Sequence, residues 1–382
     1  MAERAAADSR VARRAGLRRA LLGGLWRLLA VAAVAAVLAA GSPAYAAVSQ
    51  RDRDRSATAF KRASAFYDAG KFVEALREFQ NAALLDPDRV EAYFAQGLCL
   101  LRLNERDLAA ERFERTLALA PDHAAAHYNL AVALEQKGDT ASARRHLQRA
   151  LTSDPRTPGA HFALARLAEK GGNRAAAIGE LRRELALHPD SALVHAQIGY
   201  LFAAAHQDDS ARVHLDRALR LDPRLARACL DRGRLEERAA RWAAAESLYA
   251  RGLAADSTDF DLWFARAGAL FRLERFEDAA DGYRRAAGLD AHSAAAAFSR
   301  GVALERAGDP NGARDAYAEA VARDSAYADA WLNLGLLYGR AGARDEAARY
   351  LERYLELAPD SERAAQVRAI LDDLKKKPRP GR

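Results

Sequence analysis

The chain repeats itself every 34 residues. Proline recurs at one place in the period, and serine or alanine holds the register where proline is absent: Pro87, Pro121, Pro155, Pro189, Pro223, Ser257, Ala291, Ser325 and Pro359. A second place holds alanine in every unit: Ala75, Ala109, Ala143, Ala177, Ala211, Ala245, Ala279, Ala313 and Ala347. Units of this length bury their apolar faces by stacking on one another. The period therefore predicts one elongated array rather than several unrelated domains.

Each unit is predicted to be two antiparallel helices. With Ser56 as position 1, position 8 is always Gly or Ala, which lets two helices approach closely, and position 24 is always apolar or aromatic. The proline near the end of the unit would stop the second helix. A glycine at position 15 would end the first helix in a left-handed residue in five units: Gly70, Gly138, Gly172, Gly308 and Gly342.

The unit resembles the tetratricopeptide repeat (TPR). The ninth unit matches best, through Trp331, Leu334, Gly335, Tyr338, Ala347 and Pro359, which follow the family pattern. The resemblance covers residues 56–361, with units starting at residues 56, 90, 124, 158, 192, 226, 260, 294 and 328. It implies an all-α fold, an α-solenoid with a right-handed superhelix of nine helix-turn-helix units. Glu184 departs from the pattern, since it replaces a small residue at position 27.

The segments that flank the repeats have different expected roles. Residues 47–55 are expected to be a linker. Residues 362–377 are expected to form a capping helix, because four apolar residues recur there on one helical face: Val367, Ile370, Leu371 and Leu374. Residues 378–382 form a basic tail.

The first 46 residues have the composition of a secretory signal peptide. A basic start precedes an uncharged apolar run over 28–40, and Ala44-Tyr45-Ala46 offers a small-residue cleavage site. Cleavage after Ala46 would give an exported protein of the periplasm or cell envelope. The alternative is an uncleaved membrane anchor over about residues 20–40.

Charge and cysteine content limit the partners. Residues 47–374 carry 47 Lys and Arg against 50 Asp and Glu, so the basic charge belongs to the two ends of the chain. The repeat body therefore offers no basic face for a nucleic acid. Cys99 and Cys229 lie almost four repeats apart, too far for a disulfide, and both are expected to be buried thiols.

The residues most suited to contact a partner lie on the first helices. The resemblance implies that position 6 faces a concave groove, and position 5 is usually aromatic. These two positions supply the candidate partner-binding residues: Phe94, Tyr128, Asn129, Phe162, Phe264, Phe298 and Asn333. An apolar groove would be interrupted near the sixth repeat by Asp231 and Arg234. The alternative is that the aromatic residues at position 5 simply pack between neighbouring helices.

A row of cations at position 13 is a second candidate. It comprises Arg238, Arg272, Arg306 and Arg340. These side chains could bind an acidic segment or an anionic polymer, or they could stabilise the C-terminal ends of their own helices.

Three histidines occupy position 4 of consecutive repeats: His127, His161 and His195. Residues in a row 8–10 Å apart are poorly placed to converge on one metal ion, so these side chains are expected to pack between helices. No sequence motif for a metal, a cofactor, a phosphate or a catalytic nucleophile is evident. The chain is therefore not expected to be an enzyme or to bind a cofactor.

These observations predict a non-catalytic protein-protein interaction scaffold of the bacterial cell envelope, which binds a protein or peptide segment in its groove. Two alternatives remain open. One is an accessory subunit of a system that makes or exports an envelope polysaccharide, with the polymer bound along the arginine row. The other is a TPR adaptor tethered to the membrane by its N-terminal segment.

Overall fold

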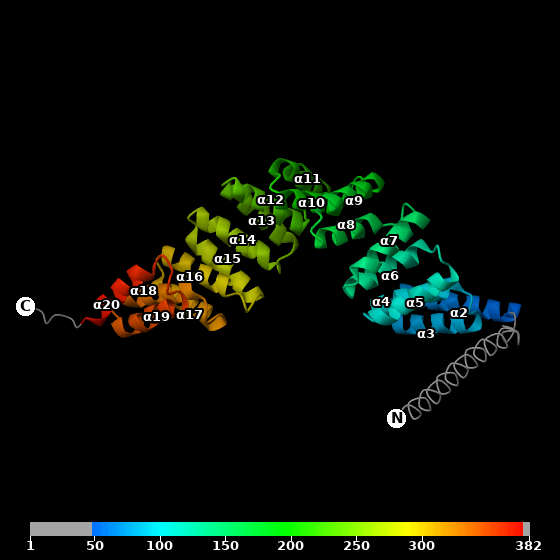
Figure 1. Cartoon of the computed structure of the whole chain (residues 1–382), viewed down its shortest axis with the longest axis horizontal. Helices are drawn as coiled ribbons and strands as arrows, with labels where there is room; N and C mark the ends of the chain where they lie inside the picture. Colours follow the sequence, from blue (N-terminus) through cyan, green and yellow to red (C-terminus); the bar gives the residue numbers. More distant parts are fainter. Residues whose placement is uncertain (1–47, 377–382) are drawn as a thin grey trace, which may run out of the picture. The chain divides into compact units, whose positions relative to one another are not determined.

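The computed structural model describes residues 48–376, and all secondary structure in that range is helical. Eighteen helices, α2 to α19, form nine consecutive pairs joined by short turns, and a final helix, α20, follows them (Figure 1). The expected all-α solenoid is therefore confirmed. The predicted signal peptide or membrane anchor within residues 1–46, the basic tail over 378–382 and the last residue of the predicted cap lie outside the described residues.

The chain divides into two compact units, the first ending at Thr157 and the second beginning at Pro158. The first unit contains three helix pairs: α2 (Gln50–Asp68) with α3 (Phe72–Leu85), α4 (Val90–Arg102) with α5 (Arg106–Leu119), and α6 (Ala124–Gln136) with α7 (Thr140–Ser153). Within this unit α3 packs on α4, and α5 packs on α6, so the second helix of one pair packs on the first helix of the next. Each pair thus completes the core of its neighbour.

The second unit contains six pairs and the terminal helix. The pairs are α8 (Ala160–Lys170) with α9 (Arg174–Leu187), α10 (Ala192–Ala204) with α11 (Asp208–Leu221), α12 (Ala226–Arg238) with α13 (Trp242–Ala255), α14 (Phe260–Arg272) with α15 (Phe276–Leu289), α16 (Ala294–Arg306) with α17 (Pro310–Arg323), and α18 (Ala328–Arg340) with α19 (Arg344–Leu357). The helix α20 (Ala364–Lys375) packs on α19 and buries Val367 and Leu371. The last repeat is thus covered.

The small residue at position 8 packs under the residue at position 24 of the same repeat. A Cβ placed on Gly233 would lie 2.3 Å from the Tyr249 ring, and a Cβ on Gly301 would lie 2.5 Å from the Tyr317 ring. The two helices of a repeat therefore approach each other too closely for a larger residue unless the ring moves.

Every repeat ends its first helix with a left-handed residue at position 15. The five predicted glycines have φ values from 73° to 88°, which confirms their role. The other four repeats place a residue with a Cβ in this conformation: Asn104, His206, Ala240 and Glu274, with φ from 55° to 64°. The turn geometry thus persists where glycine is absent.

Two helices differ from the expected limits. The helix α2 begins at Gln50, so it includes residues assigned above to a linker; the Ser49 hydroxyl accepts a hydrogen bond from the Asp52 N–H at its start. The helix α8 begins two residues after its predicted start, because Gly159 precedes it with φ 74°. No helix in the described part of the chain is both long and apolar enough to span a membrane.

Both cysteines are free and fully buried, as expected. Burial raises the pKa of the Cys99 thiol to about 11. This thiol therefore stays protonated near neutral pH and is a poor nucleophile.

Candidate functional site

The aromatic residues at position 5 pack against their own repeats and remain partly exposed. In the first unit the Phe94 ring lies 5.7 Å from Phe113 and 4.8 Å from His123, measured between centroids. In the second unit Phe264 lies 5.2 Å from the Tyr283 ring. Of the other members of this set, Tyr128 is half-buried in the first unit, and Phe162 packs on a core cluster of the second. These rings contribute to the core and still present an edge to solvent.

Tyr317 brings two of the candidate residues together. The Phe298 ring lies 5.5 Å from the Tyr317 ring, and the Asn333 side chain is hydrogen-bonded to the Tyr317 hydroxyl. That hydroxyl donates to Glu305 at 3.1 Å. In contrast, the Asn129 amide donates to the Ala125 carbonyl of its own helix at 2.8 Å. Asn333 is therefore tied to the packing between repeats, whereas Asn129 is not.

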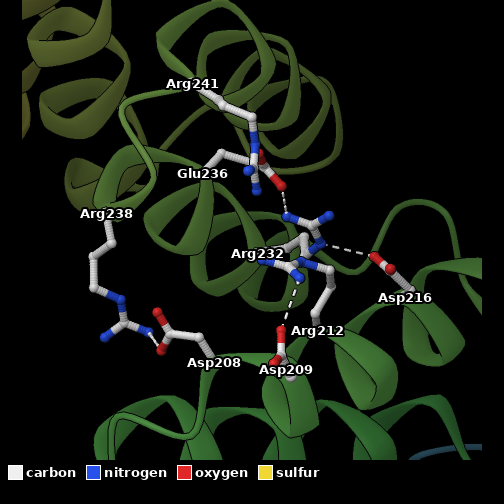
Figure 2. Close-up of polar contacts among 8 residues, drawn as sticks. All are labelled: Asp208, Asp209, Arg212, Asp216, Arg232, Glu236, Arg238 and Arg241. Atoms are coloured by element: carbon white, nitrogen blue, oxygen red, sulfur yellow. Dashed lines mark hydrogen bonds and ion pairs between the residues drawn. The ribbon is translucent and has the colours of Figure 1, made fainter.

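Each arginine at position 13 reaches back to the preceding repeat. Arg238 donates to the Asp208 carboxylate at 2.7 Å (Figure 2). It also donates to the Ala203 carbonyl at 3.1 Å. Arg340 forms an ion pair with Glu305 at 2.7 Å. These two arginines therefore have carboxylate partners within the solenoid.

The two middle arginines of the row stack on aromatic rings instead. The Arg272 guanidinium lies 4.6 Å from the centre of the Trp242 ring. The Arg306 guanidinium lies 4.9 Å from the Phe276 ring and 5.7 Å from the Phe271 ring. Among the described residues, neither forms an ion pair with a carboxylate. Both are exposed, so the edge of each guanidinium that carries the N–H groups stays open to an anion.

Sequence reasoning missed a fifth arginine at position 13, which also stacks on an aromatic ring. Arg102 also occupies position 13, in the first unit, and its guanidinium lies 4.8 Å from the centre of the Phe72 ring. The aromatic partners share position 17 of the preceding repeat: Trp242, Phe276 and Phe72. An aromatic residue at position 17 of one repeat together with an arginine at position 13 of the next is the signal that could have identified Arg102.

A polar cluster surrounds the buried carboxylate of Glu236 in the sixth repeat (Figure 2). Asp231 and Arg234, which were expected to interrupt the apolar face there, form their own ion pair at 3.9 Å. Arg232 donates to Asp216 at 2.7 Å and also pairs with Glu236, which in turn pairs with Arg241. The hydrogen bonds from Arg241 and Arg232 lower the pKa of Glu236 to about 2, against the opposing effect of its burial. This carboxylate is therefore ionised at any physiological pH.

An apolar pocket lies between the last repeat and the terminal helix. It has a volume of about 480 Å³. Its floor comes from α18, where Gly335 and Gly339 leave space, and its wall comes from α20. Leu336 and Ile370 provide apolar lining, and the charged groups at its edge are Arg340 and Asp373. This pocket was not predicted, because it depends on how α20 docks.

The histidines at position 4 pack as expected, but each has a partner at position 23 that sequence reasoning missed. The His127 Nε2 lies 2.9 Å from the Pro121 carbonyl and therefore donates to it, so its Nδ1 accepts from the Nδ1 of His146 at 2.9 Å. His195 and His214 repeat this pair at 3.1 Å. His161 pairs instead with Glu180 at 2.7 Å.

Burial has the largest effect on the pKa values of the paired histidines. Burial lowers the pKa of all four paired histidines, and nearby arginines lower it further. No group of three or more metal-binding side chains occurs in the part of the chain that the structure describes.

In two other repeats a tryptophan at position 4 contacts the equivalent backbone carbonyl of the preceding repeat. The Trp263 indole donates to the Ser257 carbonyl at 2.9 Å, and the Trp331 indole donates to the Ser325 carbonyl at 3.0 Å. Position 4 thus serves to hold the end of one repeat against the start of the next.

Solved structures of similar fold include YrrB, described as a TPR protein with an unusual peptide-binding site, and PilW, described as a type IV pilus biogenesis factor. YrrB is 23% identical, with a TM-score of 0.46 over 50% of this chain and 97% of that one. PilW is 20% identical, with a TM-score of 0.47 over 56% of this chain and 97% of that one. MamA from Desulfovibrio magneticus RS-1 is 19% identical, with a TM-score of 0.42 over 44% of this chain and 96% of that one. Identities and scores this low carry no inference about partner or activity. No curated protein matches the sequence.

Two family models match the repeats, both described as tetratricopeptide repeat. One matches residues 60–107, 100–161, 136–192, 230–294 and 264–327. The other matches residues 304–371. Proteins built from these repeats generally act as non-catalytic scaffolds for protein or peptide partners. Because the first model alone covers more than half of the sequence, the chain belongs to the tetratricopeptide repeat family.

Proposed function

We propose that this protein is an exported scaffold of the bacterial cell envelope that binds a segment of a partner protein on the first helices of its second unit. The face concerned is the one on which positions 5, 6, 9, 12 and 13 lie, which helical spacing places on one side of each first helix. It is called the first-helix face below.

One observation carries the proposal. Successive repeats of the second unit present half-buried apolar side chains on this face, namely Phe264, Phe298, Val302 and Leu336. Partly exposed apolar groups aligned on neighbouring helices favour association with another protein. Packing holds these side chains in place, so binding would need little further ordering.

Cross-linking in living cells tests this proposal. A photoreactive amino acid placed at Val302 or at Leu336 is expected to capture a partner. The same residue placed at Leu289, which is 42% exposed on the second helix α15, is the matched control. Capture of equal yield from all three positions, or from none of them, would refute binding at the first-helix face.

The envelope location rests on the sequence of residues 1–46 alone. The mature protein is expected to begin at Ala47 and to appear in the periplasmic fraction. Mass measurement of the purified protein checks this. A mass that includes residues 20–40 would favour the membrane-tethered adaptor instead.

The polysaccharide alternative is supported by the same arginines that stack on aromatic rings. An envelope polymer rich in carboxylates could lie along Arg272 and Arg306. Binding of an anionic glycan that is lost in the variant with both arginines changed to Gln would favour this role over the scaffold.

A further inference from the structure

We infer that the partner segment is acidic, and that it binds in an extended form with its carboxylates on Arg272 and Arg306 and an apolar side chain in the pocket against α20. The inference rests on the proposed function and specifies its ligand.

The first step is the state of the two arginines. Stacking on Trp242 and Phe276 holds each guanidinium in a fixed plane, which reduces the conformational entropy lost when an anion binds. The outer members of the row differ, since Asp208 and Glu305 already neutralise Arg238 and Arg340. The uncompensated positive charge of the row therefore lies on its two middle members.

The second step is the pocket beyond Arg340. The helix that forms its wall is held by Arg344, which donates to the carbonyl oxygens of Asp373, Leu374 and Lys376 at 2.5 to 3.1 Å. A pocket of about 480 Å³ exceeds the size of one leucine side chain, and its lining is mostly apolar. Asp373 at the edge is paired with Lys376. A buried apolar side chain suits this pocket better than a sugar does, so a polypeptide is favoured over an anionic polysaccharide.

The third step is spacing. Equivalent residues of neighbouring repeats lie roughly 8–10 Å apart, and an extended chain covers about 10 Å in three residues. Two acidic residues separated by about three positions would therefore reach Arg272 and Arg306. An apolar residue about four positions further along would reach the pocket beside α20.

The test measures binding of a labelled peptide with this pattern of two glutamates and one leucine to the full chain, by fluorescence polarisation. Replacing both glutamates with glutamine, or changing Arg272→Gln and Arg306→Gln together, is expected to weaken binding about tenfold. The matched control is Arg102→Gln, which removes a similarly stacked arginine from the other unit and is expected to leave binding unchanged.

A second variant tests the pocket without disturbing the fold. A Cβ on Gly339 would meet only the Ala347 Cβ, at 3.8 Å, and leucine has a higher helix propensity than glycine. The change Gly339→Leu is therefore expected to fold and to fill the pocket. It should weaken the leucine peptide about tenfold but should not affect a peptide with serine in place of leucine. Gly288→Leu, at an open position on α15, is its control.

Three outcomes separate the inference from the proposed function. If cross-linking at Leu336 captures a partner but neither set of variants alters peptide binding, the acidic segment is wrong while the scaffold role stands. If an anionic polysaccharide binds, and binds equally to the Gly339→Leu variant, the ligand is a polymer and the inference is overturned. If neither partner nor peptide binds, both proposals fail.

Discussion

The left-handed residue at position 15 allows a quantitative test of how the repeats are held together. Ala240 takes φ 55° between α12 and α13, where five other repeats have glycine. A residue with a Cβ pays about 1–2 kcal/mol in this conformation, and glycine loses roughly 0.5–1 kcal/mol more than alanine in backbone entropy. The change Ala240→Gly is therefore expected to stabilise the second unit by about 0.5–1 kcal/mol.

The reverse change and a neighbouring change provide the controls. A Cβ on Gly138 would meet no atom within 4 Å, so Gly138→Ala introduces backbone strain without a clash. It is expected to destabilise the first unit by about 1 kcal/mol. Ala239 has φ −88°, so Ala239→Gly should also destabilise, because only the entropy loss remains.

Urea unfolding of the full chain measures the three free-energy changes. Hydrogen exchange of the amides in α12 and α13 assigns the Ala240→Gly effect to the sixth repeat. If Ala240→Gly lowers stability as Ala239→Gly does, then the residue is not left-handed in solution, and the common turn geometry of the repeats is refuted.

Three further predictions concern buried polar groups. Because folding lowers the pKa of each paired histidine, the unfolded chain takes up protons first, and stability should fall as pH decreases from about 6.5 to 5.5, by at most about 1 kcal/mol per histidine. The dependence of the urea midpoint on pH over this range should become weaker when the position 23 partners His146 and His214 are changed to Leu. Glu184 is buried with one carboxylate oxygen unpaired among the described residues, and most other repeats have alanine at its position; Glu184→Ala should therefore raise the unfolding free energy by about 1–2 kcal/mol, and an unchanged value would show that this oxygen is satisfied. Glu236→Gln should lower stability by about 1–3 kcal/mol at neutral pH; because the folded pKa of Glu236 is depressed, the carboxylate contributes fully above its unfolded value of 4.5 and loses its effect as pH falls through about 2, so the difference between variant and wild type in acid denaturation should shrink over that interval.

The repeat could be predicted from sequence because its packing is local. The close contact between Gly233 and Tyr249 lies within one repeat, and it recurs at a fixed spacing, so the pattern of small and large residues was sufficient. The left-handed turn was predicted only where glycine marks it. At Glu274 the geometry is imposed by the helices on both sides, and no single-residue preference could have indicated it.

The candidate site was harder to predict, because its chemistry depends on pairs of positions rather than on single ones. All four arginines of the row occupy the same position, and sequence alone treats them as equivalent. The structure separates them through the residue that each meets in the preceding repeat: a carboxylate neutralises Arg238, whereas an indole orients Arg272. We therefore expect Trp242→Asp to neutralise Arg272 and to remove its contribution to binding of the acidic peptide, measured by fluorescence polarisation, without changing any residue of the seventh repeat.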